Sequence, residues 1–114
     1  MDLITNATGI YSTQYFTDRC LQVISDHNTS QPLFLYVAYQ ANVKLQAPQK
    51  YIDMFTHIKS TERRVFAAMA YAMDESIGRV VRALNDRQML ANSIVVFVSD
   101  NGGPASGFTG MPDL

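Results

Sequence analysis

The stretch that decides the fold is a continuously apolar run, Leu33-Phe34-Leu35-Tyr36-Val37-Ala38-Tyr39. Unbroken rather than alternating apolar residues are typical of a strand buried on both faces, as in a parallel sheet. A second run of β-branched and aromatic residues has the same character, Ile94-Val95-Val96-Phe97-Val98. The sequence therefore predicts two buried strands.

Helical periodicity separates these two runs. The clearest periodic segment opens at Thr61, carries Glu62 in its first turn and continues to about residue 86. Its apolar residues recur every three or four positions, at Phe66, Met69, Met73, Ile77, Val80, Val81 and Leu84. The order of strand, long helix and strand predicts a right-handed βαβ crossover.

Two further helical segments are expected upstream. Apolar residues spaced by three and four predict a helix from about 12 to 27, with Ser12 or Thr13 as its N-cap. A short helical turn is expected around 49–55, after Pro48.

The predicted elements are too few for a complete domain. A helix over 62–86 would be roughly 37 Å long, whereas a compact chain of this size has a radius of gyration of about 13–14 Å. Parallel strands this apolar also need helices on both faces and further strands beside them. We therefore expect residues 1–114 to be part of a larger α/β domain, or a chain that a partner completes.

Composition excludes several classes of protein. Nine basic and ten acidic side chains give a net charge of −1, so no basic surface for nucleic acid is predicted. The longest apolar run is about half of a bilayer span, and the N-terminus lacks the order of a signal peptide. The single cysteine, Cys20, has no partner for an internal disulfide. We expect a soluble chain with no membrane span.

A candidate metal site follows the second predicted strand. Asp100 and Asn101 offer hard oxygen donors that suit Ca²⁺ or Mg²⁺, and Gly102 and Gly103 permit the turn that would aim both at one ion. The alternative is an Asx turn that simply closes the strand. Two ligands also fall short of the six to eight that calcium takes, so the others must come from outside this chain.

The remaining chemistry-bearing residues are interpreted as structural. Asp74 and Glu75 are expected to be solvated carboxylates within a helix, and His27 and His57 have no spaced partner. Cys20 lies on the apolar stripe of the first helix, which favours a buried, inert thiol. No catalytic or cofactor-binding residue is assigned.

Two Asn-x-Ser/Thr sequons occur in predicted loops. Asn6 and Asn28 are therefore candidate N-glycosylation acceptors, and they matter only if the protein enters the secretory pathway.

Several blocks of the chain, in order from about residue 10 to 103, resemble the sulfatase family, in particular its branch of arylsulfatases B, I and J. The blocks are Tyr11-Ser12-Thr13-Gln14-Tyr15-Phe16-Thr17-Asp18, Pro32 to Gln40, Leu45-Gln46-Ala47-Pro48, Tyr71 to Gly78 and Ser99-Asp100-Asn101-Gly102-Gly103. The resemblance implies an alkaline-phosphatase-like α/β fold with a mostly parallel sheet and flanking helices. Residues 1–114 would be a middle slice of its catalytic domain.

The same resemblance implies a calcium-dependent sulfuric ester hydrolase. In that family a formylglycine held on calcium attacks the sulfur of a sulfate ester. Asp100 and Asn101 match the family's Asp-Asn metal pair, whereas Asp74 and Glu75 match a helix pair with a structural role. A sulfate ester substrate and a lysosomal or extracellular location in the secretory pathway are implied for a complete parent protein.

The chain departs from the family pattern at the catalytic positions. Cys20 is not followed by the Pro and Arg of a formylglycine motif, and no Asp-Asp pair occurs. The stretch 41–46 lacks the family's sulfate-binding histidine. Lys44 could supply a positive charge nearby, but it cannot replace the acid–base range of the imidazole. We therefore expect residues 1–114 to be inactive by themselves. The alternative is a non-catalytic, degenerate sulfatase-like binding module, and an unrelated flavodoxin-like domain ranks last.

Overall fold

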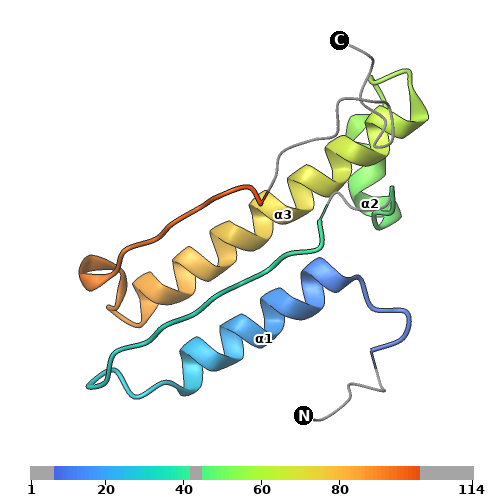
Figure 1. Cartoon of the computed structure of the whole chain (residues 1–114). Helices are drawn as coiled ribbons and strands as arrows, with labels where there is room; N and C mark the ends of the chain where they lie inside the picture. The colour runs from blue at the N-terminus through green and yellow to red at the C-terminus, as the bar shows by residue number, and fades with distance from the viewer. Residues whose placement is uncertain (1–6, 42–44, 101–114) are drawn as a thin grey trace.

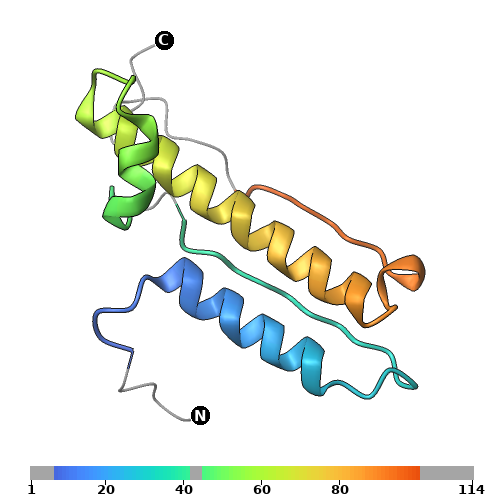
Figure 2. The ribbon, with the colours of Figure 1, turned by 180° about the vertical axis from the view of Figure 1, so that it is seen from behind.

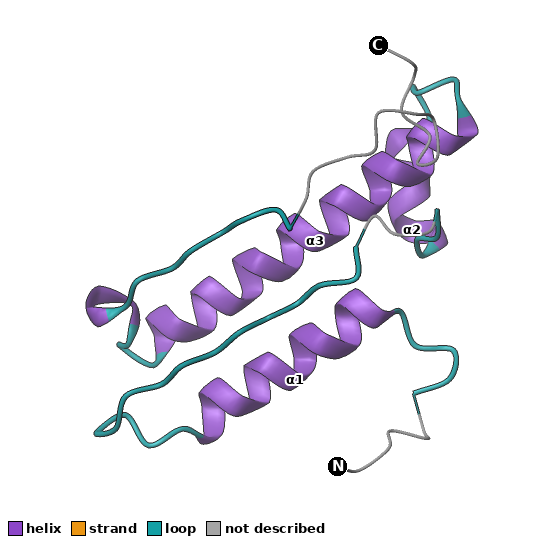
Figure 3. Cartoon of the chain, viewed as in Figure 1, coloured by secondary structure: helices purple, strands orange, loops and turns teal. Residues whose placement is uncertain are grey.

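The structure is a computed structural model, and it describes residues 7–41 and 45–100 (Figure 1). The described residues contain three α helices and two short 3-10 turns, coloured in Figure 3. In chain order these are α1 at Ser12–Asp26, α2 at Gln49–Ile52, η1 at Asp53–Phe55, α3 at Thr61–Asp86 and η2 at Leu90–Asn92. The helices expected at 12–27, around 49–55 and from Thr61 to about 86 are thus confirmed, whereas η2 was not predicted.

Helix α1 begins at Ser12, so its N-cap is Tyr11 and not Ser12 or Thr13. Tyr11 occupies the N-cap position in an extended conformation, and its side chain makes no capping hydrogen bond. The prediction that Ser12 or Thr13 caps the helix is therefore wrong, because both lie inside it. The buried face consists of Thr13, Thr17, Cys20 and Ile24. These positions are spaced by four, three and four residues, so they form one stripe along the helix.

Helix α3 is long and continuous (Figure 1). Ser60 caps it, since its Oγ accepts a hydrogen bond from Arg63 N at 3.4 Å. Twenty-six residues at 1.5 Å each give about 39 Å. The chain is accordingly elongated, with a radius of gyration of 16.3 Å and a longest extent of 49 Å. Small residues on the buried face, Ala68, Ala72 and Ser76, let neighbouring elements approach α3 closely.

The end of α3 is a Schellman motif without glycine. Met89 N donates to Leu84 O at 2.9 Å, and Gln88 N donates to Asn85 O at 2.8 Å. Gln88 has a φ of 57°, the left-handed conformation that this motif needs and that glycine usually supplies. The chain therefore stores some backbone strain at Gln88.

The two predicted strands are extended segments without sheet hydrogen bonds. Residues 33–39 and 94–98 are assigned no strand, and no strand is found elsewhere in the described ranges. Both segments nevertheless run in the same direction and opposite to α3, as a βαβ crossover requires (Figures 1 and 2). The sheet itself stays a prediction, because a strand needs a neighbour to pair with its backbone.

The core lies where the helices meet. Helix α3 packs against α1 and α2. Tyr51, Ala68 and Ala72 form a buried cluster, which Tyr11 and Phe55 partly cover. The extended segments are much more open, since Phe34 is 91% exposed and Ile94 is 93% exposed. The described residues thus form a helical layer whose apolar extended segments are largely uncovered.

Candidate functional site

The candidate metal residues lie at the end of the second extended segment. Asp100 directly follows residues 94–98 and Ser99, and its side chain is exposed. Asn101, the other predicted ligand, lies outside the described residues, as do Gly102 and Gly103. The pairing of Asp100 with Asn101 around one ion therefore remains a prediction.

The sequence predicts that Asp100 lies at the carboxyl edge of a sheet, and the described structure shows it at the end of an extended segment. Both extended segments end toward the end of the molecule at which α1 begins (Figures 1 and 2). In open α/β folds this carboxyl edge is where ligand sites form. The start of α1 also carries the positive end of that helix dipole. A ligand site at Asp100 stays a prediction, because the sheet whose edge would carry it is not formed by the described residues.

The described residues do not by themselves build a metal centre. Within residues 7–41 and 45–100, no group of three or more His, Cys, Asp or Glu side chains is close enough to hold an ion. The chemistry of Asp100 fits calcium, which prefers carboxylate and amide oxygens. One described carboxylate is compatible with a calcium site only if most ligands come from elsewhere.

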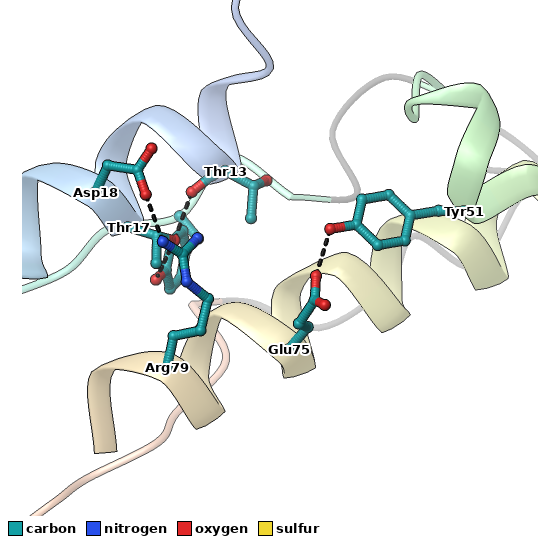
Figure 4. A network of polar contacts seen from close by, with 7 residues as sticks. Thr13, Thr17, Asp18, Tyr51, Glu75 and Arg79 are labelled. Carbon is teal, nitrogen blue, oxygen red and sulfur yellow. Dashed lines mark hydrogen bonds and ion pairs between the residues drawn. The ribbon is translucent and has the colours of Figure 1, made fainter. Parts of the chain in front are cut away.

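Glu75 joins two helices. The Tyr51 hydroxyl of α2 donates a short hydrogen bond to Glu75 Oε2 of α3 (Figure 4). Tyr51 is only 4% exposed, and its burial, followed by the hydrogen bond to Glu75, raises the pKa of its phenol. Lys50 Nζ also lies 4.4 Å from the centre of the Tyr51 ring. Asp74 and Glu75 are both exposed, as the sequence predicts, and Glu75 in addition binds the Tyr51 hydroxyl of α2.

A part-buried pair of hydroxyls attaches the first extended segment to α1. Thr17 Oγ1 donates to Thr13 O at 2.6 Å (Figure 4). The same oxygen lies 2.9 Å from Tyr39 Oη. Because the single Thr17 hydroxyl proton is used toward Thr13, the Tyr39 hydroxyl donates to Thr17. Burial raises the pKa of Tyr39. Sequence reasoning missed this pair, and the only available signal was the threonine spacing of four within an otherwise apolar stripe.

Two buried hydroxyls near the start of α1 have no partner among the described residues, Tyr11 Oη and Thr13 Oγ1. Buried polar groups in folded proteins are nearly always hydrogen-bonded. We therefore expect their partners among residues that the structure does not describe or in another part of the same domain.

Cys20 is buried in this structure. It is 7% exposed, and burial raises the pKa of its thiol, which disfavours the thiolate. The interpretation of Cys20 as a structural residue is confirmed in this respect. An apolar groove of about 380 Å³ opens beside it, lined by Phe16, Arg19, Cys20, Val23 and residues 35–38.

The two histidines make local contacts. His27 Nε2 is 2.9 Å from Gln31 O in the loop after α1. The exposed His57 ring lies 6.1 Å from the Phe55 ring, measured between ring centres. These local contacts agree with the structural roles that the sequence predicts.

With this geometry established, comparison with known proteins assigns the class. The sulfatase family model matches residues 2–112, and the chain belongs to the sulfatase family. The chain is similar to "Arylsulfatase J" of Mus musculus, with 45% identity over 106 residues that cover 91% of this chain and 18% of the relative. It is also similar to "N-acetylgalactosamine-6-sulfatase" of Sus scrofa, with 32% identity covering 79% of this chain and 16% of that protein.

A solved structure shares both sequence and fold. The crystal structure described as Ps i-CgsB in complex with k-i-k-neocarrahexaose matches with a TM-score of 0.66 and 33% identity, over 69% of this chain and 18% of the other. The chain thus spans about a fifth of the length of the relatives it matches. Family membership implies the alkaline-phosphatase-like α/β fold. Among the helices of the described ranges, none combines the length and apolarity that a bilayer span requires.

Proposed function

We propose that this chain is part of a calcium-dependent sulfuric ester hydrolase, in which Asp100 and Asn101 supply two of the metal ligands. The observation that carries the proposal is the position of Asp100 at the carboxyl end of an extended segment, in a chain that a sulfatase model matches over residues 2–112. The similarity to Arylsulfatase J supports a sulfate ester as the substrate class.

Calcium, when bound, supplies Lewis-acid polarisation of the sulfate oxygens. The contribution of this chain is to place hard oxygen donors at the sheet edge and to hold that edge with the helical layer. The Thr17 contact to Tyr39 attaches the first extended segment to α1, close to its carboxyl end. The nucleophile and the remaining ligands come from residues outside this chain, since the formylglycine motif is absent from it.

The proposal has a direct test in a protein that contains the complete domain. Asp100→Ala should lower both the calcium content and the turnover of an aryl sulfate. Asp74→Ala is the matched control, because it removes an exposed carboxylate from α3 without touching the sheet edge. Calcium content and turnover that are both unchanged in Asp100→Ala would refute the ligand assignment. The 114-residue chain itself should show no hydrolysis above that of its Asp100→Ala variant.

The apolar extended segments support a larger sheet in the complete domain. Phe34 and Tyr36 are 91% and 79% exposed, and Ile94 and Phe97 are 93% and 71% exposed. Side chains of this size are normally buried in a folded domain. We infer that residues 33–39 and 94–98 pair with further parallel strands of the same domain, whose other layer covers these side chains.

The secretory pathway is the location that this function favours, with a lysosomal or extracellular destination. Its support is the similarity to sulfatases such as Arylsulfatase J and N-acetylgalactosamine-6-sulfatase.

A non-catalytic sulfatase-like binding module is the second candidate. The observation in its favour is the stretch 41–46, which carries Lys44 but no histidine. The two candidates differ in a complete domain: the module would bind a sulfate ester without hydrolysing it, whereas the enzyme would release inorganic sulfate.

A further inference from the structure

The loop between α1 and the first extended segment presents an exposed asparagine with an ordered side chain. Asn28 belongs to the sequon Asn28-Thr29-Ser30, and all three residues are exposed. Asn28 Oδ1 accepts two hydrogen bonds, from Ser30 N at 3.1 Å and from Ser30 Oγ at 2.9 Å. The hydroxyl that defines the sequon therefore already faces the amide of the acceptor residue.

The same contacts leave the amide nitrogen available. Both printed interactions of the Asn28 side chain use its oxygen, and within the described part of the chain no contact involves Asn28 Nδ2. The nitrogen is the atom to which a glycan is attached. A sugar bound there would extend into solvent without displacing a buried group.

The loop backbone is fixed by three contacts. Gln31 N donates to Asn28 O at 3.0 Å, and His27 Nε2 lies 2.9 Å from Gln31 O. Arg87, the C-cap residue that follows α3, donates from Nη2 to His27 O at 2.8 Å. The loop is thus a defined turn attached to the end of α3, and it holds Asn28 away from the helical core.

The turn also lies far from the candidate metal residue along the fold. The turn lies at the start of the first extended segment, whereas Asp100 lies at the end of the second, which runs in the same direction (Figure 1). A bulky glycan on this loop would leave the carboxyl edge open to substrate.

From these observations we propose that Asn28 is an N-glycan acceptor. In the transfer, the Asn28 Nδ2 lone pair forms a C–N bond to the anomeric carbon of a lipid-pyrophosphate-linked oligosaccharide. The bond from that carbon to the phosphate oxygen breaks, the lipid pyrophosphate leaves with its electron pair, and one amide proton passes to a base of the transferase. The proposal rests on the secretory location proposed above and not on hydrolytic activity.

The test expresses the 114-residue chain behind a cleavable secretory leader in mammalian cells, in an Asn6→Gln background that removes the other sequon. The peptide containing Asn28 is analysed by mass spectrometry before and after enzymatic release of glycans, which converts a glycosylated Asn to Asp. Chains whose leader has been removed should carry a glycan at Asn28. Asn28→Gln and Ser30→Ala should reduce glycosylation to background, whereas Ser30→Thr should retain it.

Recovery of leader-cleaved chains with an unmodified Asn28 peptide would overturn the proposal, and so would a glycan that persists in Asn28→Gln. Removal of the leader proves that the chain reached the lumen, so either result is decisive. The measured quantity is the mass of a glycopeptide. A negative result would therefore refute glycosylation of Asn28 without bearing on calcium binding or on sulfate ester hydrolysis.

Discussion

Arg79 of α3 lies 2.6 Å from Asp18 of α1, measured from Nη2 to Oδ1, and joins the two long helices at their exposed edge (Figure 4). The side chains are 35% and 60% exposed, so water competes with the pair. Exposed ion pairs contribute about 0–1 kcal/mol. The packing of small residues along α3, rather than this pair, holds the helices together.

Asp18→Asn should therefore lower the free energy of unfolding by less than about 1 kcal/mol. The measurement is urea unfolding followed by circular dichroism at low salt and at high salt. The effect should shrink at high salt because counterions screen the pair. A loss of several kcal/mol that persists in high salt would show that the pair is more than a surface contact.

Thr17→Val should be more costly, because it leaves the part-buried Tyr39 hydroxyl without its acceptor. The expected loss is about 1 kcal/mol, at the lower end of the range for an unsatisfied buried polar group, because water can partly replace the acceptor. Thr17→Ser is the control, since it keeps both hydrogen bonds and removes only a methyl group. If Thr17→Ser destabilised the protein as much as Thr17→Val, the methyl packing and not the hydroxyl would be responsible.

The Tyr51 contact to Glu75 predicts a loss of stability in alkali. The pKa of Tyr51 is raised in the folded protein by burial and by the hydrogen bond to Glu75. Its contribution is therefore fully present below the ordinary phenol pKa of about 10 and is lost as the pH rises through the higher folded pKa. Unfolding curves between neutral pH and strong alkali should show this decline, and Tyr51→Phe should make it shallower. An unchanged slope in Tyr51→Phe would assign the decline to other groups.

Gln88→Gly should stabilise the protein. Gln88 has a φ of 57°, which costs a residue with a side chain roughly 1–2 kcal/mol and costs glycine almost nothing. After the entropy that glycine gains in the unfolded chain, the net gain should be below about 1 kcal/mol. Gln88→Ala is the matched control, since alanine also loses the long side chain but keeps the Cβ that makes the left-handed conformation unfavourable, so it should bring no such gain. Equal stabilisation by the two changes would contradict the strain argument.

The exposed apolar segments predict opposite effects in two contexts. Phe34→Lys combined with Ile94→Lys should increase the monomeric fraction of the 114-residue chain, as sedimentation would show, because it charges two side chains that are over 90% exposed. In the complete domain the same pair should lower the melting temperature, since both positions are expected to be covered there. Unchanged stability of the complete domain would contradict the proposed sheet.

The helices were predictable because their signals are local. The apolar spacing in residues 61–86 and the Ser60 and Thr61 boundary are readable without any knowledge of the rest of the fold. The strands depend on distant partners, so their apolar runs could predict burial but not pairing. The N-cap of α1 was mispredicted because capping preference favours Ser and Thr, whereas Tyr11 occupies that position.

For the candidate site, the sequence indicates only residue chemistry. Asp100 was chosen because a carboxylate follows an apolar run, and its metal ligation and its place at a sheet edge both stay predictions. The contact between Thr17 and Tyr39, which attaches the first extended segment to α1, could not be predicted, because the two residues are 22 positions apart in the sequence. The αL conformation of Gln88 had no signal either, because neither Gly nor Asn marks the position.

The shared direction of residues 33–39 and 94–98 also has a consequence for the order of folding. Two parallel segments cannot meet through a short hairpin, and the whole of α3 must form between them before they lie alongside the same layer. Contacts over long sequence separations form slowly, whereas the helical contacts of α1 and α3 are mostly local within each helix. We expect the helices to fold and pack first, and the parallel strands to pair afterwards against the helical layer. Amide hydrogen exchange during refolding of the complete domain should therefore protect residues 61–86 before residues 94–98.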